Sequence, residues 1–234
     1  MPYSQIMTVT VLLLAFVNLL NNRIVPRAYL ATSVFASGVL LLVADGAGLT
    51  RADVGLTADG HSVLWALAGL SVVATANLVA ALMPTTRVGY ADRRFVAADG
   101  RQAAYQVLVR IPLGTVLLEE IAFRGVIYGL INRAHGGVAA TAVSSLLFGL
   151  WHVLPSLDLI RLNALASRTV HGRAGLAVAA AVLATTLAGV LLCELRRHSG
   201  GLLAPAVVHW ATNGLGYLTG FLLARRSRRP GTEE

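Results

Sequence analysis

The chain has 234 residues, of which 56% are hydrophobic and 13% are charged, and its mean hydropathy is +0.70. Soluble domains carry about 25% charged residues, so the composition indicates a membrane protein. The formal net charge of +8 comes from arginines that lie between apolar blocks, where they suit anionic lipid headgroups. This placement argues against a nucleic-acid partner. The single cysteine, Cys193, excludes an intramolecular disulfide.

Long apolar blocks follow one another along the chain, and each approaches the roughly 20 residues that cross a bilayer. They predict helices, because lipid cannot satisfy free backbone groups. The expected spans are 6–20, 28–44, 62–83, 105–131, 137–154, 174–195 and 201–223. Residues 154–173 are ambiguous and could form a short interfacial helix or an eighth, partial span. The predicted fold class is therefore all-α, a polytopic transmembrane bundle of about seven spans around an intramembrane cavity.

The chain divides into three predicted regions. Residues 1–104 hold N-terminal transmembrane helices and a loop, residues 105–223 form a helical core, predicted to be catalytic from the motifs described below, and residues 224–234 are a basic tail. Arginine without lysine, together with abundant alanine, valine and glycine, is typical of a GC-rich bacterial genome.

Arginine distribution predicts the orientation of the bundle. With seven spans, one side of the membrane receives Arg23, Arg27, Arg87, Arg93, Arg94, Arg101, Arg161, Arg168, Arg173, Arg225, Arg226, Arg228 and Arg229. The other side receives Arg51, Arg133, Arg196 and Arg197. The positive-inside rule places the richer side in the cytoplasm. We therefore expect a multi-pass protein of the bacterial cytoplasmic membrane with a cytoplasmic C-terminus.

The fourth expected span carries three charges in the run LLEEIAFRG, namely Glu119, Glu120 and Arg124. Residues four apart share a helix face, so Glu120 and Arg124 can pair and shield each other from lipid. Glu119 points about 100° away from Glu120 and can face a cavity, where a carboxylate can serve as a general base. The alternative is a purely structural glutamate–arginine clamp, which explains Glu120 and Arg124 but leaves Glu119 unexplained.

Two later spans carry imidazoles. Phe148 and His152 lie one helical turn apart in SSLLFGLWHVLP, and Pro155 is expected to end that helix. His209 and Asn213 share one helical face in GGLLAPAVVHWATNGLG, where two donors one turn apart can stabilise a developing oxyanion. Hydrogen bonding between helices is the alternative role for each of these side chains.

The three patterns together, E-E-x-x-x-R, F-x-x-x-H and H-x-x-x-N, closely resemble one family of intramembrane proteases. It is the CAAX-processing type II endopeptidase and bacteriocin-immunity group, also called the CPBP or abortive-infection family. The matching residues are Glu119, Glu120, Arg124, Phe148, His152, His209 and Asn213. These patterns lie within residues 105–223, about half of the chain, and the first hundred residues match only in being hydrophobic.

The resemblance implies a helical bundle with a conical cavity inside the membrane. By matching position, Glu119 activates the attacking water, His152 assists, and His209 and Asn213 form the oxyanion pocket, while Glu120 and Arg124 fix the geometry. The family's metal dependence is disputed. A zinc ion would take Glu119, His152 and His209 as ligands, whereas the alternative is a metal-free glutamate mechanism.

The predicted function is hydrolysis of a peptide bond in a membrane-associated peptide or protein, with the lipid bilayer as the other partner. Eukaryotic members of the family remove the last three residues of prenylated CaaX sequences, but the residues of this chain do not identify its substrate or its oligomeric state. Two other classes stay open. A non-catalytic immunity or scaffold protein predicts that Glu119→Gln leaves function intact, and a proton-coupled transporter predicts inverted repeats.

Overall fold

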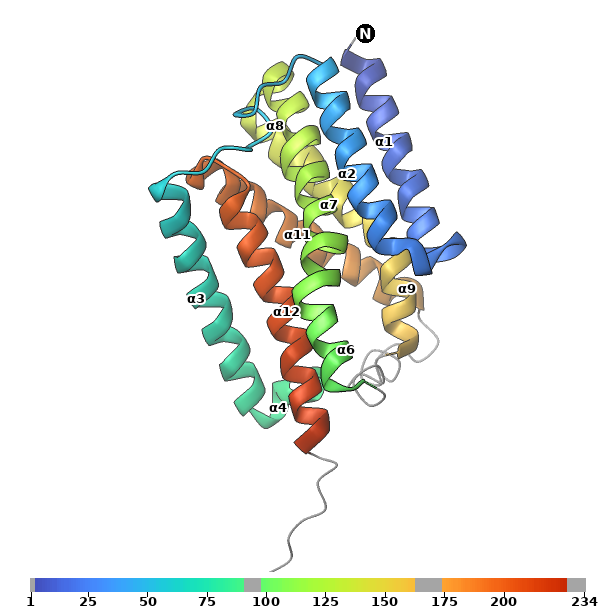
Figure 1. Ribbon diagram of the computed structural model, residues 1–234, viewed down its shortest axis with the longest axis vertical. Helices are drawn as coiled ribbons and strands as arrows, with labels where there is room; N and C mark the ends of the chain where they lie inside the picture. Colours follow the sequence, from blue (N-terminus) through green and yellow to red (C-terminus); the bar gives the residue numbers. More distant parts are fainter. Residues whose placement is uncertain (1–2, 91–97, 163–173, 227–234) are drawn as a thin grey trace, which may run out of the picture.

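The computed structural model describes residues 3–90, 98–162 and 174–226. Helices and their connections make up these ranges, and no strand occurs within them. The predicted all-α class is therefore confirmed. The main helices are α1 (Tyr3–Leu19), α2 (Tyr29–Gly46), α3 (Gly60–Leu82), α6 (Gly100–Tyr105), α7 (Leu117–Glu119), α8 (Tyr128–Trp151), α9 (Val153–Leu162), α11 (Ala174–Ser199) and α12 (Leu203–Arg226), as Figure 1 shows.

Several of these helices are continued or connected by further helical segments, most of which are 3-10 or π-helices. They are η1 (Leu20–Ile24), η2 (Pro26–Ala28), α4 (Pro84–Arg87), η3 (Val88–Tyr90), η4 (Gln106–Val116) and η5 (Glu120–Ile127). Residues 100–127 thus form one continuous helical rod made of α6, η4, α7 and η5. The expected regular α-helix is wrong here, because η4 and η5 have the wider turns of a π-helix. Such turns are frequent at functional sites, and the second of them begins at Glu120.

Five helical stretches are long and apolar enough to cross a membrane. One of them, Gly100–Leu157, contains 58 residues and is broken at Gly136, where φ is +80° and the chain reverses direction (Figure 1). The 24-residue α12 lies outside this set of five. Many large apolar side chains on the helices are exposed, which is the arrangement expected of surfaces that face lipid.

The outer helices pack through small residues. On α8, a Cβ added at Gly149 would overlap the Thr186 hydroxyl of α11 and would lie 2.8 Å from the Val182 carbonyl oxygen. On α11, a Cβ added at Gly189 would lie 3.0 Å from the Ser145 Cα. Close backbone approach of this kind is the usual way in which membrane helices associate. This packing holds the end of α8, which carries Phe148 and Trp151, against α11.

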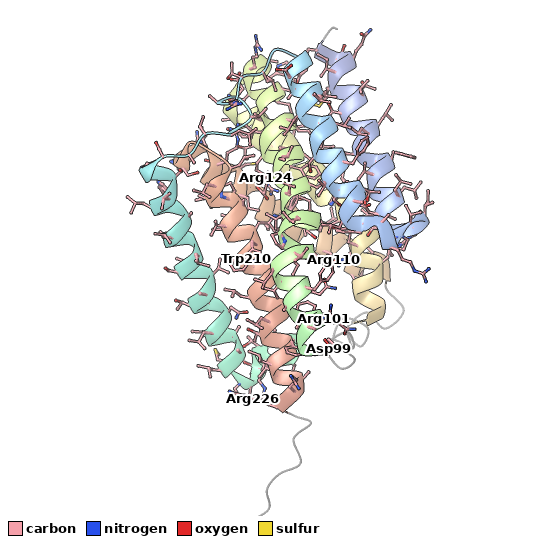
Figure 2. All side chains as sticks on the ribbon, viewed as in Figure 1. Asp99, Arg101, Arg110, Arg124, Trp210 and Arg226 are labelled. Atoms are coloured by element: carbon pink, nitrogen blue, oxygen red, sulfur yellow. The ribbon has the colours of Figure 1, made fainter. Side chains whose placement is uncertain are left out.

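Arginines lie at both ends of the bundle. The ends of α4 and α12 and the beginning of α6 lie at one end of the bundle, and Arg101 and Arg226 lie there in Figure 2, whereas α1 ends part-way along the bundle near α9. The Arg133 guanidinium, at the other end, donates to the Gly48 carbonyl at 2.8 Å. The cytoplasmic assignment of the arginine-rich end stays a prediction. Residues 93, 94, 168, 173, 228 and 229, and the side chain of residue 161, lie outside the described part of the chain.

The ambiguous segment after α8 begins with a short helix. α9 covers Val153–Leu162, and residues 163–173 lie outside the described residues. The alternative of an eighth span therefore falls outside the described part of the chain. Pro155 lies in the first turn of α9, where its missing N–H costs nothing, and it does not end α8 as predicted. α8 instead ends at Trp151, and His152 is the non-helical residue between the two helices.

Candidate active site

Glu120 and Arg124 form the predicted pair inside the helical rod. The Arg124 Nη1 lies 3.2 Å from the Glu120 Oε1, and both side chains are almost fully buried. The same carboxylate oxygen lies 2.7 Å from the His209 Nδ1, which comes from α12. One glutamate therefore joins a cation on its own helix to an imidazole on another. This network ties α12 to the middle of the rod.

One aromatic ring covers the Arg124 guanidinium. Its Cζ lies 3.9 Å from the centre of the Phe148 ring of α8, and Phe148 also makes edge contacts with Phe123 and His209. Arg124 has no exposed surface, and its Nε and Nη2 have no hydrogen-bond partner. The cation is thus stabilised by one carboxylate and one ring face, which gives Phe148 a role in the site.

Glu119 points to a different set of partners from Glu120. Its Oε1 accepts a hydrogen bond of 3.0 Å from the Trp151 indole N–H. Its Oε2 is buried without a hydrogen-bond partner and lies 3.6 Å from the His209 Nε2 and 4.0 Å from the His152 Nε2. One carboxylate oxygen is therefore fixed, while the other faces two imidazole nitrogens across a gap longer than a hydrogen bond.

His152 is the more open of the two imidazoles. Its side chain is 22% exposed, against 7% for that of His209. The His152 Nδ1 lies 2.8 Å from the Phe148 carbonyl oxygen, so this nitrogen donates to the backbone and the Nε2 is directed toward Glu119. Asn213, one turn beyond His209, is exposed, and no hydrogen bond or ion pair joins it to the other five side chains. The structure thus brings together five of the six predicted site residues.

A family comparison identifies the matching portion of the chain. The family model described as type II CAAX prenyl endopeptidase Rce1-like matches residues 101–215. This portion of the chain belongs to this family of endopeptidases. All the clustered side chains of the site lie within the matched residues. No curated protein and no solved structure matches the chain.

Membership in the Rce1-like family indicates an intramembrane protease of the CAAX type. The fold agrees with this description, because Glu119, Glu120 and His152 lie in a helical stretch that is long and apolar enough to cross a membrane. The assignment of each residue to a catalytic step does not follow from family membership.

Two residues near the site were missed by the sequence analysis. Trp151 holds Glu119 through its indole, and the Asn18 side-chain amide of α1 donates to the Trp151 carbonyl at 2.9 Å. A signal for Asn18 was present, since it is a carboxamide within an apolar span and such groups usually have a partner. Nothing in the spacing distinguished Trp151 from a packing residue. The first helix of the endopeptidase, which lies outside the family match, therefore contacts the site directly.

The described residues do not contain a group of three His, Cys, Asp or Glu side chains that could hold a metal ion. In the predicted set of Glu119, His152 and His209, the Glu119 Oε2 lies 4.0 Å from the His152 Nε2 and 3.6 Å from the His209 Nε2. These three side chains nevertheless do not form a group that could hold a metal ion. The geometry therefore gives the zinc prediction no support, and zinc stays a prediction for experiment.

An apolar cavity of about 350 Å³ adjoins the site between the rod and α12. Its lining includes Val116, Leu117, Glu120, Ala206 and Trp210, so one carboxylate of the site, that of Glu120, lies at its wall. A smaller cavity of about 220 Å³ reaches Trp151 from the side of α1. The helices therefore leave space next to the buried charges, as the predicted intramembrane cavity requires.

Proposed function

We propose that the protein is an intramembrane endopeptidase that hydrolyses a peptide bond of a membrane-associated peptide or protein, with Glu119 as the residue that activates water. The observation that carries the proposal is the Glu119 Oε2, which is buried, lacks a hydrogen-bond partner, and faces the Nε2 atoms of His209 and His152 at 3.6 Å and 4.0 Å. A water molecule at this oxygen would lie within reach of both imidazoles.

The reaction needs a base, an oxyanion stabiliser and a proton for the leaving amine. Glu119 takes a proton from water as the water oxygen bonds to the substrate carbonyl carbon. The carbonyl oxygen becomes an oxyanion, which accepts hydrogen bonds from the His209 Nε2–H and from the Asn213 carboxamide. Glu119 then gives its proton to the amine nitrogen as the C–N bond breaks. His152 assists by holding the water.

His209 can donate from both nitrogens when it is an imidazolium. Its Nδ1 faces the Glu120 carboxylate at 2.7 Å, and its Nε2 faces that of Glu119. Two carboxylates and the Arg124 guanidinium leave one negative charge, which a protonated His209 would balance. Buried charges are tolerated when they are paired, so this protonation state suits the site. Asn213 has to turn toward the substrate to act, and its exposed position one turn from His209 permits this.

The cellular setting belongs to the same proposal. We assign the protein to the bacterial cytoplasmic membrane with its C-terminus in the cytoplasm, on the basis of its arginine-rich helix ends. The substrate is a peptide or protein held in the bilayer by a lipid or a transmembrane segment. Prenylation of the substrate is not required by any contact in the site.

Purified protein and a membrane-anchored fluorogenic peptide test the proposal. Wild type should cleave the peptide, whereas Glu119→Gln should lose about 10²- to 10⁴-fold in rate, the usual contribution of a general base, with an unchanged melting temperature. The assay is then repeated with a chelator. Activity that does not change supports the metal-free mechanism, whereas activity that is lost and then restored by zinc supports a metal site. Equal cleavage by both proteins would contradict the proposal, and cellular function without cleavage would favour a scaffold.

A further inference from the structure

The smaller cavity, which we call the α1 cavity, opens toward the outside of the bundle. It has a volume of about 220 Å³ and lies between α1, η5 and α8. Phe123, Ile127 and Trp151 in its lining are buried, whereas Ala15 of α1 and Leu150 of α8 are exposed. α1 lies at the outer edge of the bundle (Figure 1). The α1 cavity therefore opens between α1 and α8, on a surface that faces lipid.

The polar side chains in the described lining already have partners within the protein. The Asn18 amide donates to the Trp151 carbonyl at 2.9 Å, and the Asn18 Oδ1 accepts from the Asn22 amide at 2.6 Å. The Trp151 indole donates to Glu119. The cavity is also smaller than the roughly 300–1,000 Å³ of sites for drug-sized ligands. A narrow space with satisfied polar groups suits a hydrocarbon chain better than water or a peptide.

Two arginines lie where α1 ends, about one turn beyond the α1 cavity. Arg23 lies in η1 and Arg27 in η2, and both are exposed. The Arg23 Nη2 donates to the Leu154 carbonyl oxygen of α9 at 3.5 Å, so Arg23 lies at the junction of α1 with the helix that follows α8. No acidic residue precedes Asp45 in the sequence. The charge that α1, η1 and η2 carry is therefore positive only.

We propose that the α1 cavity binds one acyl chain of an anionic phospholipid whose phosphate is bound by Arg23 and Arg27. The stretch Tyr3–Ile24 is long and apolar enough to cross a membrane, so Arg23, near its end, lies at the level of lipid headgroups. Guanidinium groups offer phosphate oxygens a planar fork of donors, and basic residues beside a gap between transmembrane helices bind acidic headgroups. The acyl chain enters the cavity between Ala15 and Leu150.

The lipid site is separate from the reacting groups but contacts their support. Trp151 lines the α1 cavity and holds the Glu119 carboxylate, so the bound chain packs against a residue that positions the site. The α1 residues of the cavity and both arginines lie outside the family match, which covers residues 101–215. The inference does not rest on the proposed peptidase function.

Quenching of Trp151 fluorescence by brominated lipids tests the site. The full chain is reconstituted in mixed vesicles of phosphatidylcholine and phosphatidylglycerol, with bromine near the middle of the acyl chains of one lipid or the other. Trp151→Phe, measured in parallel, isolates the signal of Trp151 from those of Trp65 and Trp210. We expect phosphatidylglycerol to bind about 10- to 30-fold more tightly than phosphatidylcholine, because each basic residue near an anionic surface contributes about 1 kcal/mol.

Matched variants separate the headgroup from the acyl chain. The double variant Arg23→Gln/Arg27→Gln should lose the preference for phosphatidylglycerol, whereas Arg51→Gln, an exposed arginine between α2 and α3, should keep it. Ala15→Phe fills the opening and should remove most of the Trp151 quenching by either lipid. Ala68→Phe, at an exposed position of α3, should leave that quenching unchanged.

Three results would overturn the inference. Equal binding of the two lipids by wild type, or a preference that the double arginine variant keeps, would show that the arginines do not select the lipid. Quenching that Ala15→Phe leaves unchanged would show that no lipid chain enters the cavity. Native mass spectrometry gives an independent count of retained phosphatidylglycerol. One lipid that Arg51→Gln keeps and the double variant loses would support the site, and equal retention by both would contradict it.

Discussion

Two neighbouring glutamates of one helix have opposite surroundings. Glu120 belongs to a closed half of the site, where a guanidinium at 3.2 Å and an imidazole nitrogen at 2.7 Å contact the same oxygen. Glu119 belongs to an open half, where one oxygen is held by Trp151 and the other faces His209 and His152 at longer distances. The same chemical group therefore has a structural setting at one position and a reactive setting at the next.

The difference shows that the contacts of each carboxylate, rather than its residue type, determine its role within a buried charge cluster. The closed half compensates its charges and fixes the helices, while the open half keeps an oxygen free for a reacting water. His209 touches both halves, with one nitrogen toward each glutamate. Substitutions can therefore separate stability from activity, and the following predictions are ordered by the size of the expected effect.

Arg124→Met should cause the largest loss of stability. It leaves Glu120 as a buried carboxylate without its cation, and breaking a buried pair in this way costs about 3–5 kcal/mol. The free energy of unfolding in detergent, measured by denaturant titration, should fall by that amount. Arg197→Met is the control, because Arg197 pairs with Glu194 at the surface, where its side chain is 51% exposed. An equal effect of the two substitutions would show that the closed half does not stabilise the fold.

His209→Asn should reduce activity more than stability. The substitution removes the donor that faces the Glu119 side, and loss of one oxyanion donor costs about 10²- to 10³-fold in kcat. Cleavage of the anchored peptide measures this effect, with His198→Asn as the control because the His198 side chain is 57% exposed. Activity within about threefold of wild type would remove His209 from the mechanism.

The sequence predicted the closed half better than the open half. Glu120 and Arg124 are four residues apart on one helix, so their pairing follows from helix geometry, and the structure shows it. The contact of His209 with Glu120 joins residues 89 positions apart, and the motifs suggested only that they share a site. The roles of Trp151 and Asn18 depend on how α1 packs against α8. Pairing between distant helices is set by side-chain packing, which local periodicity does not encode.

Gly149→Ala tests the packing that positions the open half. The added Cβ would overlap the Thr186 hydroxyl and approach the Val182 carbonyl, so α8 has to move away from α11. Overpacking of this kind costs about 1–3 kcal/mol, and the melting temperature should fall accordingly. Gly216→Ala on α12 is the control, because no atom lies within 4 Å of the added Cβ. If Gly149→Ala is as stable as this control, α8 and α11 are not packed as described.

Trp151→Phe should give a smaller loss of activity than His209→Asn. It keeps the ring contact with Phe123 but removes the hydrogen bond to the Glu119 Oε1. A single hydrogen bond to a charged group contributes about 1.5–3 kcal/mol, and we expect about a tenfold loss of kcat, because Glu119 loses the donor that fixes it. Asn18→Leu, which loosens the Trp151 backbone, should give a smaller loss in the same direction. A kcat equal to that of wild type would mean that Trp151 is only a packing residue.

The most direct test of the central claim compares Glu119→Gln with Glu120→Gln in one experiment that measures both peptide cleavage and unfolding. The account predicts that Glu119→Gln abolishes cleavage but keeps the melting temperature of wild type, because the glutamine oxygen can still accept from Trp151. Glu120→Gln should lower the free energy of unfolding by several kcal/mol, since it leaves the Arg124 cation buried and uncompensated. The opposite pattern, a stable and inactive Glu120→Gln with an active Glu119→Gln, would contradict the division of work between the two carboxylates.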